Sequence, residues 1–325
     1  MAELTLVEAV NHALARALQD DPAVIVFGED VGRDGGVFRA TDGLIERFGA
    51  ERVLDTPIAE AAIAGIAVGM AAYGLRPVAE IQFDGFMYST LDQMVNHASR
   101  LRNRTRGRLS CPMVLRAPFG GGIHAPEHHS ESPEAMFAHI PGLRAVIPSS
   151  PARAYGLLLA AIRDPDPVVF LEPKRSYRAH REEVADDGVA LALDTCFTVR
   201  EGSDLTLISW GAMLGETLAA ADTLAAEGVA AEVIDVATLK PLDADTITAS
   251  VARTGRAVIV HEAALSGGFG AEIAARLAER CLFELLAPVL RVAGYDTVMP
   301  LAKLEQHYMP SRERILEAAH EVMRY

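Results

Sequence analysis

The sequence predicts an α/β fold made of two doubly wound domains. Runs typical of buried strands alternate with helical patterns along the whole 325-residue chain. This alternation predicts parallel sheets that are covered by helices on both faces. A polar, charged stretch over residues 174–202 interrupts the alternation, and we interpret it as a linker or surface excursion. We therefore expect a first domain over residues 1–188 and a second over residues 189–325.

The elements of the first domain follow from apolar runs and their spacing. Apolar side chains at four-residue steps predict an amphipathic helix over residues 4–18. Pro57 and Pro151 stand where the first residue of a helix tolerates proline. The predicted strands are 24–27, 77–83, 112–117, 144–148 and 167–172, and the further helices are 57–73, 89–104 and 151–163.

The second domain repeats the same alternation. Its apolar runs are again short and bounded by glycine or polar residues, as expected of strands in a parallel sheet. The predicted strands are 204–211, 229–236, 256–263 and 289–296, and the predicted helices are 213–227, one from about residue 243, 269–280 and 311–325.

Composition and charge exclude several classes of protein. With 50% hydrophobic and 23% charged residues, the chain is not a disordered protein. A formal net charge of −14 argues against nucleic-acid and anionic-membrane binding, which require basic patches. The longest uncharged apolar run, residues 61–75, is too short to span a bilayer, and the N-terminus has no secretory pattern. Three widely spaced cysteines argue against a disulfide scaffold, so we expect a cytoplasmic protein.

Glu60 is the first candidate functional residue. It lies near the start of the helix predicted over residues 57–73, for which Thr56 is the expected N-cap. A capping-box carboxylate belongs at position 59, which is Ala59. Glu60 is therefore either a carboxylate favoured by the helix dipole or a buried acid that hydrogen-bonds a ligand nitrogen.

A glycine- and histidine-rich loop over residues 118–130 is the second candidate. Three consecutive glycines allow a close approach of the backbone to a ligand, and His124, His128 and His129 follow them. The loop comes after a predicted strand, where ligands of parallel α/β sheets bind. A connector with surface histidines is the alternative, and a metal site is disfavoured because His128 and His129 are adjacent.

Two further motifs have structural explanations. Arginines alternate over residues 100–108, at the expected end of a helix, where cations are favoured by the dipole. We interpret them as a solvated or interface-forming helix end. Residues 266–270, Ser-Gly-Gly-Phe-Gly, lack the spacing of a dinucleotide or phosphate loop, so we expect a tight turn.

Taken together, five segments resemble a known family. They are residues 26–44, 52–71, 74–86, 128–143 and 161–178. The chain is similar over its full length to beta subunits of the thiamine-diphosphate-dependent 2-oxo acid dehydrogenase component. The resemblance implies a transketolase-like pyrimidine-binding domain followed by a transketolase C-terminal domain. It also implies an alpha subunit in an α2β2 heterotetramer, because the Gly-Asp-Gly segment that holds diphosphate and magnesium is absent here.

The resemblance also assigns residues. Glu60 would contact the aminopyrimidine nitrogen and share its proton, which starts carbanion formation on the cofactor. Ile58, Gln82 and Phe86 match positions that contact thiamine diphosphate. His129 would move a proton or align groups as the acyl unit passes to lipoamide, with His128 as the neighbouring alternative. Relatives bind a structural potassium ion mainly through backbone carbonyls, and the matching residues are Met113, Ala161, Ile162, Asp164 and Asp166.

Partners and substrate follow from the same resemblance. The second partner is the lipoyl acyltransferase core, whose basic subunit-binding domain suits an acidic chain. Residues 132–143 and 171–178 look closer to branched-chain members, whereas residues 119–127 also resemble pyruvate members, and we favour branched-chain 2-oxo acids. The remaining alternatives are a self-contained thiamine enzyme and a non-catalytic scaffold subunit.

Overall fold

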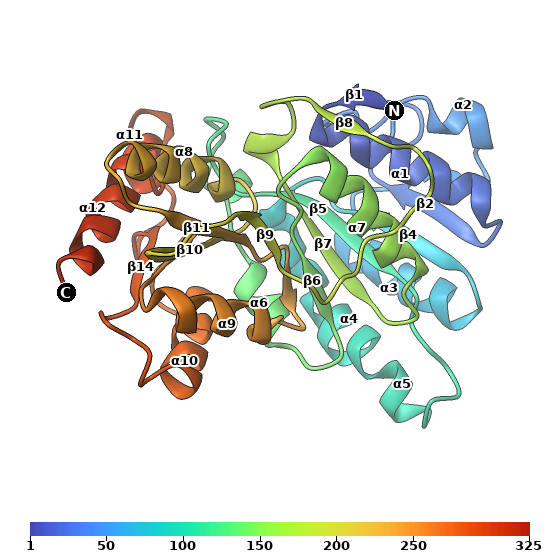
Figure 1. The fold of residues 1–325 in the computed structure, drawn as a ribbon. Helices are drawn as coiled ribbons and strands as arrows, with labels where there is room; N and C mark the ends of the chain where they lie inside the picture. Colours follow the sequence, from blue (N-terminus) through green and yellow to red (C-terminus); the bar gives the residue numbers. More distant parts are fainter. The chain divides into compact units, whose positions relative to one another are not determined.

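The computed structural model describes residues 1–325, and the chain folds into two compact units (Figure 1). The first unit consists of residues 1–119 and 136–193, and the second of residues 120–135 and 194–325. Each unit has a mainly parallel sheet between helices, so the predicted fold class is confirmed. Residues 120–135 were not expected to associate with the C-terminal half. None of the helices is long and apolar enough to cross a membrane.

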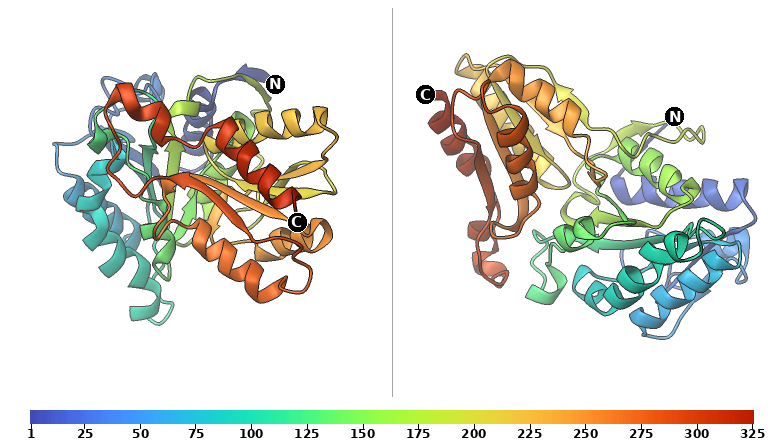
Figure 2. Two further views of the ribbon diagram at one scale, coloured as in Figure 1. Left: turned by 90° about the vertical axis from the view of Figure 1, so that its left-hand side faces the viewer. Right: turned by 90° about the horizontal axis from the view of Figure 1, so that it is seen from below.

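The sheet of the first unit is parallel throughout. Its strands run in the order β6 (Arg144–Val146), β7 (Val168–Pro173), β5 (Val114–Phe119), β4 (Arg76–Glu80), β2 (Val24–Gly28) and β3 (Val53–Asp55). Helices α1 (Leu6–Asp20) and α7 (Pro151–Arg163) pack together on one side, and α3 (Glu60–Ala72) and α4 (Leu91–Asn96) pack together on the other (Figures 1 and 2). An antiparallel pair, β1 (Ala2–Leu4) and β8 (Glu182–Val184), completes the unit.

The sheet of the second unit is parallel except for one edge strand. The order is β14 (Leu290–Gly294), β13 (Ala257–Ala264), β10 (Leu205–Ser209), β11 (Ala231–Asp235) and β9 (Phe197–Arg200), and β9 runs antiparallel to β11. Helices α8 (Met213–Ala226) and α12 (Arg312–Met323) pack against one side of the strands, and α9 (Ala244–Thr254) and α10 (Gly270–Arg280) pack together (Figure 2).

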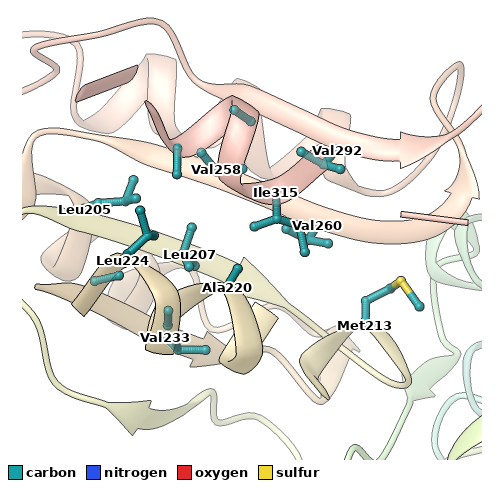
Figure 3. Close-up of a cluster of buried hydrophobic side chains, with 14 of the residues drawn as sticks. Leu205, Leu207, Met213, Ala220, Leu224, Val233, Val258, Val260, Val292 and Ile315 are labelled. Atoms are coloured by element: carbon teal, nitrogen blue, oxygen red, sulfur yellow. The ribbon is translucent and has the colours of Figure 1, made fainter. Parts of the chain in front are cut away.

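A cluster of buried side chains explains why one face of these strands is apolar. Strand side chains such as Leu207, Val233 and Val260 meet Leu224 of α8 and Ile315 of α12, and all of them are buried (Figure 3). Each such side chain contributes roughly 1.5–3 kcal/mol when it is removed from water. This apolar packing fixes the position of β13, the strand that carries Glu262.

Two predicted helices were wrong in detail, and several short elements were not predicted. The helix expected from Pro57 starts at Glu60, and its N-cap is Ala59 rather than Thr56. The helix expected over residues 89–104 is interrupted at His97 and appears as α4 and α5 (Leu101–Arg104). The short elements α2 (Leu44–Phe48), α6 (Glu134–His139), α11 (Ala302–Tyr308) and β12 (Thr238–Lys240) were not predicted.

The stretch from residue 174 is not a solvated linker at its start. Lys174 is buried, and its ammonium group lies 2.7 Å from Asp84 Oδ2. Tyr177 is buried as well and donates a hydrogen bond of 2.6 Å to Glu172. The charge of Lys174 and the hydroxyl of Tyr177 suggested that both side chains would be exposed to solvent. In the folded unit, however, both groups have hydrogen-bond or ionic partners, which allows their burial. Residues 178–181 are exposed, as expected of a surface excursion.

Candidate functional site

Glu60 is the first residue of α3, so its carboxylate lies at the positive end of that helix. The chain reaches it from β3 through residues 56–59, and the Thr56 N–H donates to the Gly28 carbonyl at 2.9 Å. This bond ties the approach to α3 to the end of β2. Glu60 itself is half-buried. Its place at a helix start fits the interpretation as a carboxylate favoured by the helix dipole, whereas the expected full burial of the acid is not seen in this chain alone.

A second carboxyl group, Glu29, lies beside Glu60 and was missed by the sequence analysis. Glu29 directly follows β2 and is only 4% exposed. Burial, and next the negative charge of Glu60, raise the pKa of Glu29, while a hydrogen bond from the Ala59 backbone opposes that shift. Its Oε1 atom and the Thr56 hydroxyl are buried without hydrogen-bond partners. The fold therefore favours the protonated form of Glu29 relative to an exposed glutamate.

The predicted cofactor-contacting side chains lie in the same unit. Gln82 follows β4, and its side-chain amide donates to Asp30 Oδ2 at 2.8 Å. Phe86 is half-buried and meets Phe83 edge-on with ring centroids 6.1 Å apart. Ile58 is 84% exposed, although it is a large apolar side chain. Glu60, Gln82 and Phe86 all come from segments that follow the carboxyl ends of strands, which is where parallel sheets bind ligands.

A buried ionic network lies across the carboxyl ends of the neighbouring strands. The Arg116 guanidinium on β5 binds Glu172 of β7 through two hydrogen bonds of 2.7 and 2.8 Å, and it also pairs with Glu80 of β4. All three side chains are almost completely buried. Burial and the charge of Glu172 raise the pKa of Glu80, and Arg116 opposes that shift. The network fixes the end of β4, two residues before Gln82.

The histidine loop (residues 120–130) belongs to the second unit. Its second half forms a 3-10 turn, Glu127–His129, closed by hydrogen bonds of 2.9 Å from His129 N–H to the Pro126 carbonyl and from Ser130 N–H to the Glu127 carbonyl. His129 is half-buried, whereas His124 and His128 are exposed. His128 and His129 present their rings edge to face, with centroids 6.2 Å apart. His129 is thus the more enclosed of the two adjacent histidines.

No cluster of three or more His, Cys, Asp or Glu side chains is arranged to hold a metal ion. The residues present nevertheless suit the pyrimidine half of thiamine diphosphate. A carboxylate at a helix start, the orphaned Glu29 oxygen and Thr56 hydroxyl, and an amide at Gln82 supply polar groups, and the Phe83–Phe86 pair supplies aromatic surface.

The residues matched to a potassium site lie together in the first unit, where Arg76 already supplies a positive charge. The carbonyls of Ile162 and Asp164 accept hydrogen bonds from Arg76 at 2.9 and 3.2 Å. The Met113 carbonyl accepts from Val168 N–H at 3.0 Å. The Ala161 carbonyl accepts from the Asp164 N–H, and the Asp166 carboxylate pairs with Arg102. Each carbonyl keeps a second lone pair, so a potassium ion would share these oxygens with Arg76.

The two minor motifs behave as expected of structural features. Arg102 pairs with Asp166, and Arg104 donates to the Asn96 carbonyl at the exposed end of α5. The 266–270 segment is a turn leading into α10, with Gly267 at φ +71°. A Cβ atom on Gly268 would lie 2.6 Å from the His261 ring, so glycine is required there by packing. No signal in the sequence indicated this contact.

Comparisons with known proteins assign both halves of the chain to known domain families. The transketolase pyrimidine-binding domain matches residues 2–180, and the transketolase C-terminal domain matches residues 195–315. A solved structure described as a split-gene transketolase, an inactive beta4 tetramer, superimposes with a TM-score of 0.82 at 24% identity, covering 99% of each chain. At that identity the likeness shows the fold.

Curated relatives are much closer in sequence. A pyruvate dehydrogenase E1 component subunit beta from Bacillus subtilis is 48% identical over 325 residues, which covers 100% of both chains. One from Acholeplasma laidlawii is 50% identical over 315 residues, covering 97% of this chain and 96% of the relative. With two matching domain families and full-length relatives at this identity, the chain belongs to the 2-oxo acid dehydrogenase beta subunits of the transketolase-like superfamily.

Proposed function

We propose that this chain is the beta subunit of a pyruvate dehydrogenase component, which decarboxylates pyruvate and transfers the acetyl group to lipoyl groups. The observation that carries the proposal is the full-length similarity to curated pyruvate dehydrogenase beta subunits. The sequence segments favoured branched-chain 2-oxo acids, but these relatives carry the pyruvate name, so pyruvate is the substrate that we now prefer. Glu60 at the start of α3 supplies the carboxylate that the reaction requires.

Within this proposal Glu60 binds the aminopyrimidine nitrogen of thiamine diphosphate and holds the proton that is shared with it. The bound cofactor supplies a carbanion for attack on the 2-oxo carbon and an electron sink for loss of carbon dioxide. Glu29 lies beside Glu60, and burial together with the charge of Glu60 raises the pKa of Glu29. Ile58, Gln82 and Phe86 contact and orient the pyrimidine.

An alpha subunit would complete the site in an α2β2 assembly. The outer face of α3 supports a partner, since Ala61, Ala62, Ile66 and Gly69 are exposed on a helix that is apolar all round. Ile58, directly before this helix, is exposed as well. The alpha subunit would supply the magnesium and diphosphate ligands that are not clustered in this chain. The lipoyl acyltransferase core is the second partner that we propose.

The first test is the loss of decarboxylation in the assembled complex. Glu60→Ala in a complex with the alpha subunit should reduce pyruvate-dependent reduction of an artificial electron acceptor to background, whereas the wild-type complex should turn over.

The substrate is tested with a panel of 2-oxo acids on the wild-type complex. A higher kcat/KM for branched-chain acids than for pyruvate would reverse our assignment. In the Glu60 test, unchanged pyruvate-dependent activity of the Glu60→Ala complex would favour the alternative that this chain is a non-catalytic scaffold subunit.

His129 is proposed to act after decarboxylation, when the acyl group passes to lipoamide. His129→Ala should therefore lower reductive acylation of a lipoyl domain while the rate with an artificial acceptor is retained. His128→Ala is the matched control, because it removes a more exposed ring next to it in the sequence. Equal loss in both assays for His129→Ala would contradict this role.

A structural potassium ion also belongs to the proposal. Backbone carbonyls replace the hydration shell of potassium. The proposed ligands, mostly through their backbone carbonyls, are Met113, Ala161, Ile162, Asp164 and Asp166. Thermal unfolding in potassium chloride and in choline chloride at equal ionic strength tests it, because a ligand of the folded state raises the melting temperature. Identical melting temperatures in the two salts would remove potassium from the proposal.

A further inference from the structure

The histidine loop is attached to the rest of the second unit by two glutamates from distant parts of the chain. Glu262 lies on β13, and Glu305 lies on α11. Glu262 is 5% exposed and Glu305 is 2% exposed, so both carboxylates are held away from bulk water. A buried carboxylate is stable only when hydrogen bonds or charges satisfy it. In both cases the histidine loop supplies donors.

Glu305 binds the loop at three atoms. Its Oε1 accepts from the Gly122 N–H at 2.7 Å, and its Oε2 accepts from the His124 N–H at 3.1 Å. The His124 ring nitrogen Nδ1 lies 2.7 Å from the same Oε2. Both carboxylate oxygens are thus used by one short segment, and hydrogen bonds to an ionised carboxylate are stronger than neutral ones.

Glu262 binds Gly121 at the start of the loop and Ser132, which lies two residues after the loop ends. The Gly121 N–H donates to Glu262, and the Ser132 hydroxyl lies 3.4 Å from the same oxygen. A Cβ atom on Gly120 would lie 2.7 Å from Glu262 Oε1, so the carboxylate fits only because the loop lacks a side chain there. A hydrogen bond of 2.9 Å joins the two ends of the loop, from the Gly120 N–H to the carbonyl of Glu131, the residue after the loop.

The backbone at His124 shows that this attachment imposes a conformation. His124 has φ +61°, in the left-handed region that residues other than glycine rarely adopt. Such a conformation persists only where surrounding contacts determine it, and strained residues of this kind concentrate at functional sites. Here the contacts are those to Glu305, which engages both the backbone and the ring of the strained residue. Five residues later the chain reaches His129.

We infer that Glu305 and Glu262 are positioning residues, which fix the histidine loop and thereby place His129 for acyl transfer. The inference rests on the proposed function of His129. Neither glutamate needs to touch the substrate, because each acts through the backbone of residues 121–124. Removing an acceptor leaves N–H groups of the loop without their partner and lets the loop move. The carboxyl groups around Glu60 lie outside the loop, so the step in which Glu60 acts should be unaffected.

The experiment uses the complete complex with its alpha subunit. In Glu305→Gln, one acceptor oxygen becomes a donor that faces an N–H or the His124 ring. We expect kcat for reductive acylation of a lipoyl domain to fall by about tenfold or more. Turnover with an artificial electron acceptor should stay within about twofold of wild type, which is about 0.4 kcal/mol in activation free energy, because the residues around Glu60 lie outside the loop. Glu262→Gln should show the same selective loss.

Two variants calibrate the result. His124→Ala keeps the backbone bonds to Glu305 and removes only the ring, so its loss should be smaller than that of Glu305→Gln. Glu317→Gln changes an exposed glutamate of α12 and should leave both assays unchanged. Hydrogen exchange provides a readout of the loop itself, and the amides of Gly122 and His124 should exchange about tenfold faster or more in Glu305→Gln.

The outcomes separate this inference from the proposed function. Faster loop exchange with equal losses in both assays, or unchanged acylation, would overturn the positioning role. A wild-type complex without pyruvate-dependent activity would instead overturn the proposed function, and the exchange measurement would still report whether the glutamates hold the loop. If Glu305→Gln does not assemble, Glu262→Gln supplies the same comparison from the other attachment point.

Discussion

Burial determines the charge of His261. This residue lies on β13, is fully buried and stacks on Trp210, with ring centroids 5.3 Å apart and planes at 9°. Gly268 and Gly270 pack directly against the ring. Burial and then the nearby charge of Arg291 lower the pKa of His261 to about 4. The folded chain therefore keeps a neutral imidazole in conditions under which an exposed histidine is protonated.

This shift predicts a loss of stability in mild acid. Below pH 6.5 the unfolded chain binds a proton that the folded chain does not bind until about pH 4, so the free energy of unfolding falls across that window. The contribution is up to about 3 kcal/mol. Denaturant unfolding of wild type and His261→Leu at pH 7 and pH 4.5 measures it, and the variant should lose less stability. His307→Leu, at an exposed position, is the control, and an unchanged pH dependence in His261→Leu would contradict the assignment.

The candidate site could be predicted from the sequence only where a residue lies within a recognisable segment. Glu60 and His129 stand in such segments, and Glu29 directly follows a predicted strand but was passed over. Glu305 could not be found, because it binds Gly122 from 183 positions further along the chain. Its short helix α11 carries no pattern that distinguishes its glutamate from a solvated one. Tertiary partners, rather than local patterns, decide which carboxylates are buried.

At the scale of elements, Arg116 joins three adjacent strands. Its guanidinium binds acids on β4 and β7 from its own position on β5, with no exposure to water. Arg116→Met keeps the length of the side chain but leaves Glu80 and Glu172 facing each other without a cation. Breaking a buried ion pair in this way costs about 3–5 kcal/mol. Chemical denaturation should show that loss, and a change below about 1 kcal/mol would mean that water or protons neutralise the two acids.

The start of α3 shows where local propensity fails. Pro57 and Thr56 are a good helix start by pattern, yet the helix begins three residues later, after an Ala59 with φ −165° and ψ 68°. The extended segment between β3 and α3 is held by the Thr56 N–H bond to Gly28, which a sequence pattern cannot reveal. Strand and helix types were predicted well because apolar periodicity reports burial directly, whereas boundaries depend on such contacts.

The exposed apolar face of α3, which carries Ala61, Ala62, Ile66 and Gly69, predicts an interface with the alpha subunit. Ile66 is 48% exposed in the middle of that face, so Ile66→Glu should leave the isolated chain folded, with an unchanged melting temperature. In the presence of the alpha subunit the same charge would be desolvated without a partner, and assembly should be lost. Size-exclusion chromatography of the mixed subunits measures this. Val189→Glu, at a position that is 60% exposed outside α3, should assemble like wild type, and assembly of Ile66→Glu would place the interface elsewhere.

At the scale of the whole chain, the groups that could bind thiamine diphosphate predict that this chain supplies only the pyrimidine-binding half of an active site. The first unit offers carboxyl, amide and aromatic groups near Glu60, but the chain has no cluster of acids or histidines that could hold a metal ion. Its net charge of −14 also disfavours binding of a diphosphate without a divalent cation. Contacts to the pyrimidine alone would bury only a small part of the cofactor, so we do not expect high affinity from them.

We therefore predict that the isolated chain binds thiamine diphosphate with magnesium no tighter than about 1 mM, whereas the complex with the alpha subunit binds it tightly enough to saturate well below that concentration. Isothermal titration of the two samples measures the difference. Glu60→Gln in the complex is the internal comparison, because it should weaken binding without preventing assembly. Tight binding and turnover by the isolated chain would instead identify a self-contained thiamine enzyme, since every ligand of the cofactor would then have to come from these 325 residues.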